Sequence, residues 1–290
     1  MTPASLQQIL AAVNTALAED LSHGDATTTA LFPAPSRARG LIITREAITV
    51  AGVAVARQTF RAVNGSLKII RSVRDGAKLD RECPVLVVEG DARSLLMAER
   101  VALNFLQRLS GIATLTAKFC EAVRGYRVKI LDTRKTTPGL RALEKWAVRL
   151  GGGYNHRQSL ADGILIKDNH LALTGRDVAR ACRLARERAP HGLKIEVEAQ
   201  TLDEVRAALD GGADIVLLDN MDLPSIRKAV ELIKGRALVE VSGGVTLANV
   251  REIAAVGPDL ISVGALTHSA PAVNLSMDIV PARSRRSKKR

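Results

Sequence analysis

Short apolar runs alternate with amphipathic segments through the second half of the chain. The segments between the runs, such as 201–212 and 223–235, carry apolar residues at helical spacing. Strands that alternate with helices in this way indicate a parallel sheet with crossover helices. The six apolar runs that we interpret as strands are 128–133, 163–168, 194–199, 214–220, 237–243 and 260–266.

These strands predict an open or incomplete TIM-like α/β barrel. No GxGxxG sequence follows the first strand, which argues against a doubly wound dinucleotide-binding sheet. Six strands are nevertheless fewer than those of a complete TIM barrel. The predicted fold class is therefore α/β, with a barrel that is small or open.

The pattern in the first part of the chain is different. Helical spacing spans 6–21 and 94–111, whereas 40–52, 67–73 and 84–90 have the composition of strands bounded by turns. This mixture predicts an α+β N-terminal domain that precedes the barrel.

The change of pattern also predicts the domain boundaries. We expect the α+β domain to span residues 1–110 and the barrel to span 111–268. Residues 269–282 are expected to return to the N-terminal domain. The basic segment 283–290 is predicted to be a disordered tail.

Composition narrows the range of partners. The chain has 290 residues, of which 47% are hydrophobic, enough for two globular domains. The formal net charge is +12, and six of the basic residues lie in the tail. Because aromatic residues make up only 2% of the chain, few side chains can stack on bases, and a nucleic-acid partner is not expected. The remaining positive charge belongs to the folded body and indicates an anionic ligand.

The sequence shows no targeting signal and no cysteine motif. No apolar run reaches the roughly 18 residues of a membrane span, and the N-terminus lacks the basic start and cleavage site of a signal peptide. We therefore expect a cytoplasmic protein with no membrane partner. Cys83, Cys120 and Cys182 have no metal-ligand spacing and are expected to be buried or half-buried thiols.

Polar residues or glycine end every predicted strand, at the edge where parallel α/β barrels hold their functional residues. Side chains two residues apart share a face, so Glu196 and Glu198 point the same way. Carboxylates inside a barrel need cations or a metal, and Lys135 and Lys167 are the expected partners. For the deeper Glu196 and Glu240, structural ion pairs are the simpler alternative. The strand-end residues are Thr133, Arg134, Lys135, Lys167, Asp168, Glu196, Glu198, Asp219, Asn220, Ser242, Gly243, Gly244 and Gly264.

Glycine and basic residues at these strand ends indicate an anionic ligand. Residues 242–244 and 263–265 end the last two strands, where barrels commonly hold a phosphate with backbone N–H groups. A glycine-rich loop after the first helix carries His156 and Arg157 toward the same mouth. One cationic side and one acidic side suit a ligand with several negative groups and a hydroxylated or metal-bound part.

Several of these segments match the motifs of one family. They are "DTRKTTPGLRALEKWAVRLGGGYNHR", "DGILIKDNH", "IEVEAQTLDE", "DIVLLDNM", "LVEVSGGVT" and "ISVGALTHSAPAVNLSMDI", with "EDLSHGDATTTALFP" and "AERVALNFLQRLSGIAT" in the N-terminal part. Together they resemble the quinolinate phosphoribosyltransferase family over nearly the whole chain except the basic tail. The resemblance implies a homodimer in which one subunit completes the other's site. It also implies the reaction of quinolinate with phosphoribosyl pyrophosphate, which gives nicotinate mononucleotide, pyrophosphate and CO2 in NAD synthesis, with Mg2+ required.

The resemblance further implies the roles of individual residues. Arg100 is expected to reach the site of the neighbouring subunit. Lys135, Glu198 and Asp219 are the expected catalytic residues, and the two acids also form the expected ribose and magnesium side. The other implied substrate contacts are Thr133, Arg134, His156, Arg157 and Lys167, with a 5′-phosphate cradle of Ser242, Gly243, Gly244, Val263, Gly264 and Ala265.

Three alternatives remain open at this point. A paralogue associated with molybdenum transport shares the glycine-rich half of the pattern, although "NHR" and "IKDNH" favour the quinolinate enzyme. A Schiff-base aldolase would use Lys167 as its nucleophile. An anionic-polymer binder would act through the tail, and deletion of 283–290 would separate that function from an enzyme activity.

Overall fold

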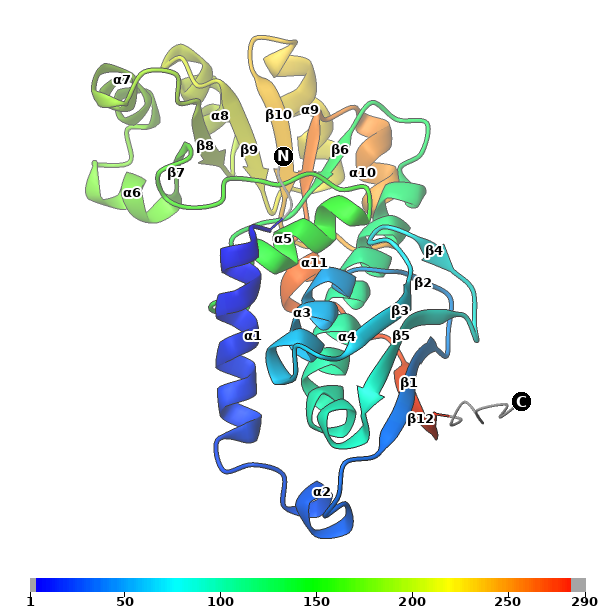
Figure 1. The fold of residues 1–290 in the computed structure, drawn as a ribbon. Helices are drawn as coiled ribbons and strands as arrows, with labels where there is room; N and C mark the ends of the chain where they lie inside the picture. Colours follow the sequence, from blue (N-terminus) through cyan, green and yellow to red (C-terminus); the bar gives the residue numbers. More distant parts are fainter. Residues whose placement is uncertain (1–3, 283–290) are drawn as a thin grey trace. The chain divides into compact units, whose positions relative to one another are not determined.

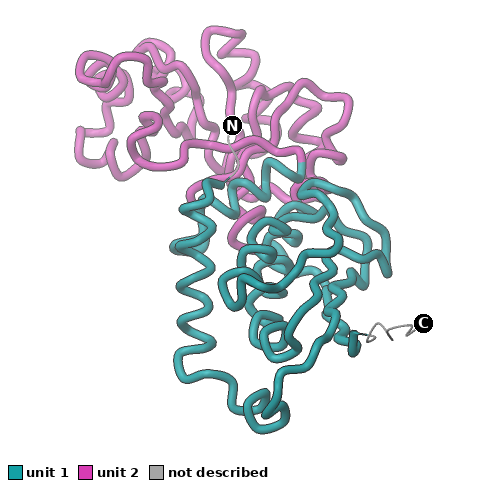
Figure 2. The backbone as a smooth tube through the Cα atoms, viewed as in Figure 1, with its two compact units in different colours: residues 1–115, 137–151, 270–290 teal, residues 116–136, 152–269 magenta. Residues whose placement is uncertain are grey.

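The computed structural model describes residues 4–282, which form two compact units (Figure 1). Within these residues, the first unit contains the chain up to residue 115, the segment 137–151 and the chain from 270 onward. The second unit contains 116–136 and 152–269 (Figure 2). The chain leaves the first unit inside the long helix α4 (Ala92–Ala122). The tail predicted over 283–290 lies outside the described residues.

The first unit combines helices with an antiparallel sheet of strand order β12-β1-β5-β3. Strand β1 pairs antiparallel with both β5 and β12, which come from distant parts of the chain. Strands β2 and β4 form a separate two-stranded ladder. Besides α4, the elements of this unit are α1 (Leu6–Leu21), α2 (Ala26–Leu31), β1 (Arg37–Thr44), β2 (Ile48–Thr49), α3 (Val53–Val63), β3 (Lys68–Ser72), β4 (Lys78–Leu79), β5 (Pro84–Asp91), α5 (Arg141–Leu150) and β12 (Leu275–Pro281).

The core of this unit lies between the sheet and helices α3 and α4. Phe60, Leu86 and Leu95 are fully buried within one apolar cluster. A buried ion pair joins α4 to α5, because the Nη2 atom of Arg108 lies 2.9 Å from Oε1 of the fully buried Glu144. Loss of the arginine would leave a buried carboxylate without its cation, so this pair holds α5 in the first unit.

The second unit is built on a parallel six-stranded sheet of order β6-β11-β10-β9-β8-β7. All six predicted strands are present. Because the strands are parallel, their carboxyl ends meet at one edge of the sheet (Figure 1). The elements of this unit are β6 (Lys129–Leu131), β7 (Ile164–Ile166), α6 (Asp168–Leu173), α7 (Val178–Arg188), β8 (Ile195–Ala199), α8 (Leu202–Asp210), β9 (Ile215–Asp219), α9 (Leu223–Ile233), β10 (Leu238–Ser242), α10 (Val250–Val256), β11 (Leu260–Ser262) and α11 (Ala265–His268).

The barrel is open, as predicted. Strands β6 and β7 are the two edges of the sheet, and no ladder joins them within residues 4–282. On its free side β6 makes a single bridge, between Leu131 and Tyr154. The prediction of an open barrel preceded by an α+β domain is therefore confirmed.

Helix caps fix the turns that follow two of the strands. Thr201 and Glu204 form a capping box at the start of α8, directly after β8. Asp222 caps α9, with its side chain accepting a hydrogen bond of 2.9 Å from the backbone N of Ser225. These caps start each helix within a few residues of the preceding strand, so the connections at this edge of the sheet are short.

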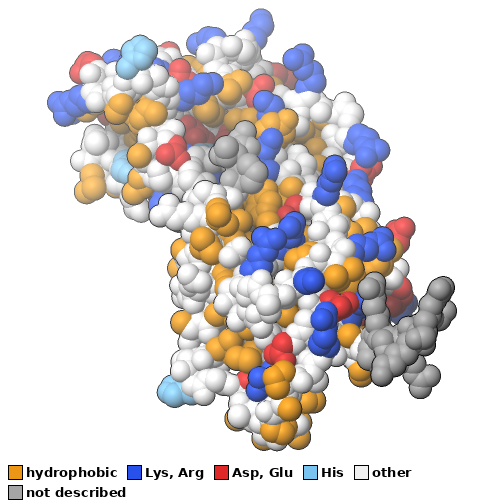
Figure 3. Space-filling view, in the orientation of Figure 1, with side chains coloured by type: hydrophobic (Ala, Val, Ile, Leu, Met, Phe, Trp, Pro, Cys, Tyr) orange, Lys and Arg blue, Asp and Glu red, His pale blue; other side chains and the backbone are white. Residues whose placement is uncertain are grey.

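Many lysine and arginine side chains lie on the face shown in Figure 3. There, lysine and arginine side chains are interspersed with acidic and apolar ones. A search of the described helices finds none that is both long and apolar enough to cross a membrane.

Candidate active site

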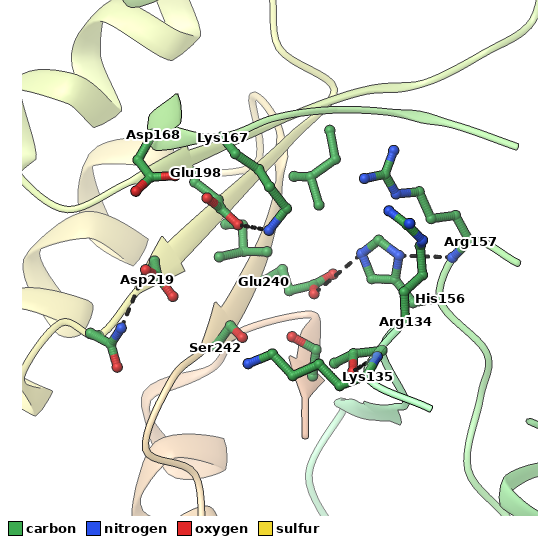
Figure 4. Close-up of a pocket in the computed structure, with 15 residues that line it drawn as sticks. Arg134, Lys135, His156, Arg157, Lys167, Asp168, Glu198, Asp219, Glu240 and Ser242 are labelled. Carbon is green, nitrogen blue, oxygen red and sulfur yellow. Dashed lines mark hydrogen bonds and ion pairs between the residues drawn. The ribbon is translucent and has the colours of Figure 1, made fainter. Parts of the chain in front are cut away.

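A cavity of about 490 Å³ lies at the carboxyl ends of the parallel strands (Figure 4). Each of the six strands contributes to it, through its own residues or those that directly follow. Nine of the predicted site residues line it: Thr133, Arg134, Lys135, His156, Arg157, Lys167, Glu198, Asp219 and Ser242. The cavity is also lined by Leu165, Asp168, Leu217, Asn220, Glu240 and Ser262.

Other predicted residues lie elsewhere. Gly243 and Gly244 line a second cavity of about 360 Å³ in the same unit. Residues 263–265 lie where β11 passes into the short helix α11, and they do not line the first cavity. Arg100 belongs to α4 in the first unit, with an exposed side chain, and is not among the cavity residues. The roles assigned to these residues stay predictions.

Two arginines form the cationic wall of the first cavity. The Nε atom of Arg134 is buried and has no hydrogen-bond partner among the described residues. Arg157 donates from Nη1 to the carbonyl of Gly163 at 3.0 Å. Burial, followed by the charge of Arg134, lowers the pKa of Arg157. Two like charges in a partly buried site favour an anion that neutralises both.

A buried aspartate joins this wall to the end of β6. Asp132 is fully buried and accepts a hydrogen bond of 2.9 Å from the backbone N of His156. Its other oxygen accepts one of 2.5 Å from Nδ2 of Asn155. The segment that carries His156 and Arg157 is thereby fixed beside the strand end that carries Arg134.

His156 faces two buried carboxylates, those of Glu196 and Glu240, and Figure 4 shows Glu240 beside the ring. Its Nε2 atom lies 3.1 Å from Oε2 of Glu196 and 3.6 Å from Oε1 of Glu240. Its Nδ1 atom accepts a hydrogen bond of 2.7 Å from the backbone N of Arg157, so the proton of the neutral ring is on Nε2. The expectation that lysines would be the partners of these carboxylates was wrong for Glu196 and Glu240, because a loop histidine takes that place.

The same three residues have the ligand types of a metal site. Their donor atoms all lie within 4.8 Å of one another. A cation at Nε2 of His156 would, however, require the ring proton on Nδ1, where the N–H of Arg157 already donates. We therefore assign His156, Glu196 and Glu240 to a hydrogen-bonded network rather than to a metal site.

Glu240 is the most perturbed acid of this network. Burial, followed by the nearby Glu196 carboxylate, raises the pKa of Glu240 to about 8. One oxygen of Glu240 is buried without a hydrogen-bond partner among the described residues. Both observations favour a neutral Glu240 at neutral pH. His156 then faces one negative carboxylate, that of Glu196, rather than two.

This pKa predicts a pH-dependent stability that Glu240→Gln removes. The pKa of Glu240 is raised in the folded protein from 4.5 to about 8, so between these values the folded state binds more protons than the unfolded state. Stability contributed by the protonated group is therefore lost as the pH rises through this window. The free energy of unfolding of Glu240→Gln minus that of the native protein should therefore increase by about 2–4 kcal/mol as the pH rises from about 5 to about 9.

Urea unfolding of both proteins across this pH range measures the difference. Exposed Glu231→Gln is the matched control and should show no pH-dependent gain. A constant difference between Glu240→Gln and the native protein at all pH values would contradict the neutral assignment.

The opposite side of the cavity is acidic. Oε1 of Glu198 lies 2.5 Å from Nζ of Lys167, so this predicted pairing is present. Oδ2 of Asp219 accepts hydrogen bonds from Nε2 of Gln200 at 3.5 Å and from Nδ2 of Asn220 at 3.3 Å. The two acids come from adjacent strands, β8 and β9. Their carboxylate oxygens are of the type that Mg2+ prefers, together with oxygens from water or substrate.

The glycine loop after β10 has a backbone that other residues rarely adopt. Gly243 and Gly244 have φ angles of 87° and 61°. The carbonyl of Gly244 accepts a hydrogen bond of 3.0 Å from Nδ2 of Asn249. Such a loop can bring backbone N–H groups close to a phosphate.

Four polar residues of the cavity wall, Asp168, Asn220, Glu240 and Ser262, were not among the predicted substrate contacts, although Asp168 and Asn220 were expected at strand ends. Glu240 lies two residues before Ser242 and shares its face, and Ser262 ends the neighbouring strand β11. Asn220 directly follows Asp219. Strand alternation was therefore a sufficient signal for Glu240, and strand-end position was sufficient for the other three.

A cavity with a cationic wall, an acidic wall and a glycine loop at the ends of parallel strands defines an α/β enzyme site for a polyanionic ligand. Models of the N-terminal and C-terminal domains of quinolinate phosphoribosyl transferase match residues 25–110 and 112–278. The chain belongs to the quinolinate phosphoribosyltransferase family.

Known relatives resemble the chain over nearly its full length. The nicotinate-nucleotide pyrophosphorylase [carboxylating] of Mycobacterium leprae is 44% identical over 273 residues, which cover 92% of this chain and 95% of the relative. A probable enzyme of the same name from Bacillus subtilis is 41% identical over 261 residues, 90% of each chain. The crystal structure of NadC from Streptococcus pyogenes has 40% identity and a TM-score of 0.92, covering 98% of this chain and 100% of that one.

Proposed function

We propose that this protein is a carboxylating quinolinate phosphoribosyltransferase of NAD synthesis. It joins quinolinate to phosphoribosyl pyrophosphate and releases nicotinate mononucleotide, pyrophosphate and CO2. Relatives with 40–44% identity carry this activity in their names. The observation that carries the proposal is the single cavity that presents Arg134 and Arg157 on one side and Glu198 and Asp219 on the other.

The cationic wall explains how two anions are brought together. Quinolinate carries two carboxylates and the sugar donor carries several phosphate charges, so the substrates repel each other in water. Arg134, Arg157 and Lys135 supply fixed positive charge that offsets this repulsion and orients both ligands. The unsatisfied Nε of Arg134 supports a carboxylate contact at that side chain.

The acidic wall suits the sugar. As the bond between the anomeric carbon and pyrophosphate breaks, that carbon gains oxocarbenium character, and the ring nitrogen of quinolinate forms the new bond. The carboxylates of Glu198 and Asp219 stabilise this positive charge or hold the ribose hydroxyls. The glycosylated ring nitrogen is positive, so it stabilises the electron pair that stays on the adjacent ring carbon as CO2 departs, and that carbon then takes a proton. None of these steps requires a covalent nucleophile.

Magnesium belongs to the same proposal. Glu198 and Asp219 offer the oxygen ligands, directly or through water and ribose hydroxyls. Bound there, Mg2+ would neutralise the charge of the departing pyrophosphate.

We also propose that the protein is a homodimer in which Arg100 of each subunit completes the site of the other. Arg100 has an exposed side chain on α4 and does not contribute to the cavity of its own chain. A further arginine would add to the positive charge that quinolinate requires. The family resemblance supports this arrangement.

The direct test measures the labelled CO2 that is released from carboxyl-labelled quinolinate. Release should depend on both phosphoribosyl pyrophosphate and Mg2+ and should match the nicotinate mononucleotide formed. Nicotinate, which lacks the second carboxylate, is the control substrate and should give little product. Absence of turnover with both substrates and Mg2+ present would refute the proposed function.

Arg134→Ala should chiefly weaken quinolinate binding. Loss of a charged hydrogen-bond donor should raise the quinolinate concentration for half-saturation by roughly 10- to 100-fold, with a smaller change for phosphoribosyl pyrophosphate. Steady-state kinetics with each substrate varied in turn measure both effects. Arg227→Ala, at an exposed position on α9, is the matched control. An unchanged half-saturation for quinolinate would remove Arg134 from this role.

The aldolase alternative has less support. A Schiff-base mechanism needs a neutral lysine amine, whereas Lys167 is in an ion pair with Glu198 at 2.5 Å. The anionic-polymer alternative concerns residues outside the described part of the chain.

A further inference from the structure

Asn220 has an unusual backbone for a residue with a side chain. It follows Asp219 at the end of β9, and its φ angle is 55°, in the left-handed region. Asparagine tolerates this region better than most residues, at a cost that glycine avoids. Its backbone N donates a hydrogen bond of 3.0 Å to the carbonyl of Ser242, so the strained residue is tied to the end of β10.

The side chain of Asn220 contacts both the acidic wall and the glycine loop. Its Nδ2 donates to Oδ2 of Asp219 at 3.3 Å. Its Oδ1 occupies the space beside Gly243, where an added Cβ would lie 2.2 Å from Oδ1 and 2.9 Å from the backbone N of Asn220. No residue other than glycine fits at position 243 while Asn220 is in place.

Asn220 also belongs to the walls of both cavities of this unit. It lines the cavity of about 490 Å³ with Asp219, and the cavity of about 360 Å³ with Gly243 and Gly244. It therefore lies between the carboxylate proposed for the ribose and the loop proposed for the 5′-phosphate.

We propose that Asn220 is a positioning residue for the sugar-phosphate donor, which fixes the Asp219 carboxylate and the Gly243 loop in one arrangement. The proposal rests on the proposed function. Because the amide touches the donor side of the cavity and neither arginine of the cationic wall, its loss should affect phosphoribosyl pyrophosphate and leave quinolinate binding intact.

The test compares Asn220→Gly with the native protein. Glycine retains the left-handed backbone and removes only the amide, so the variant should fold. We expect kcat/KM for phosphoribosyl pyrophosphate to fall by about tenfold or more, while the dissociation constant of quinolinate, measured without the second substrate, changes less than about twofold. Asn220→Asp retains the shape but places a second carboxylate beside Asp219, and it should be at least as impaired.

Lys234→Gly is the matched control. Lys234 also has a left-handed backbone, with φ of 45°, at the exposed end of α9 and away from both cavities. Relief of strain there should leave both kinetic constants unchanged. Native kinetics in Asn220→Gly, or an equal loss of quinolinate binding, would overturn the positioning role. Failure of the native protein to turn over would instead refute the proposed function.

Discussion

Asp219→Asn is expected to lower kcat by about 10²- to 10³-fold at saturating concentrations of both substrates, the usual cost of removing one preorganised electrostatic group. The substitution retains the size of the side chain and removes the negative charge that faces the anomeric carbon in the proposed mechanism. Hydrogen bonds from Gln200 and Asn220 hold the native carboxylate in one orientation. The loss should therefore appear mainly in the chemical step.

The measurement is steady-state kinetics together with quinolinate binding in the absence of the second substrate. Binding should be close to native, because the cationic wall is unchanged. Asp210→Asn, at the exposed end of α8, controls for a general effect of removing an acid. If kcat of Asp219→Asn stayed within a few-fold of native, Asp219 would not have the proposed catalytic role.

The cavity wall could largely be predicted because it follows from strand geometry. Parallel strands bring their carboxyl ends together, and alternation orients Glu198 and Asp219 without any knowledge of the loops. The same two rules account for seven of the nine predicted residues in the cavity, all except His156 and Arg157 of the glycine-rich loop.

The contacts of His156 could not be predicted in this way. His156 reaches Glu196 and Glu240 because Asp132 holds its backbone, and this is a hydrogen bond between residues 24 positions apart. No periodic pattern encodes such a contact. The sequence-based prediction considered opposite charge alone, and it therefore paired these carboxylates with Lys135 and Lys167.

The placement of α5 has a similar explanation. It follows β6 in the chain, so the alternating pattern assigns it to the barrel. The structure places residues 137–151 in the first unit, where Glu144 is buried against Arg108. A buried ion pair between distant segments depends on tertiary packing, and local sequence contains no signal for it.

We expect hybrid dimers of two inactive variants, Arg100→Ala and Lys135→Ala, to be active. If Arg100 completes the partner's site, Arg100→Ala and Lys135→Ala should each be nearly inactive alone, because every site of either homodimer lacks one required cation. The Lys135 backbone is held by hydrogen bonds to Thr133 and Thr267, so truncation of its side chain should leave the loop in place.

Mixing the two variants should restore activity. In a hybrid dimer, the chain that carries Arg100→Ala retains its own Lys135 and receives Arg100 from its partner, so one of the two sites is intact. With equal amounts and random exchange, half of the dimers are hybrids, and the mixture should recover about a quarter of native activity. Differently tagged chains verify the exchange, and mixing Arg100→Ala with itself is the control. If exchange is verified and activity stays at the level of the separate variants, Arg100 acts within its own chain or not at all, since only a site shared between subunits predicts complementation.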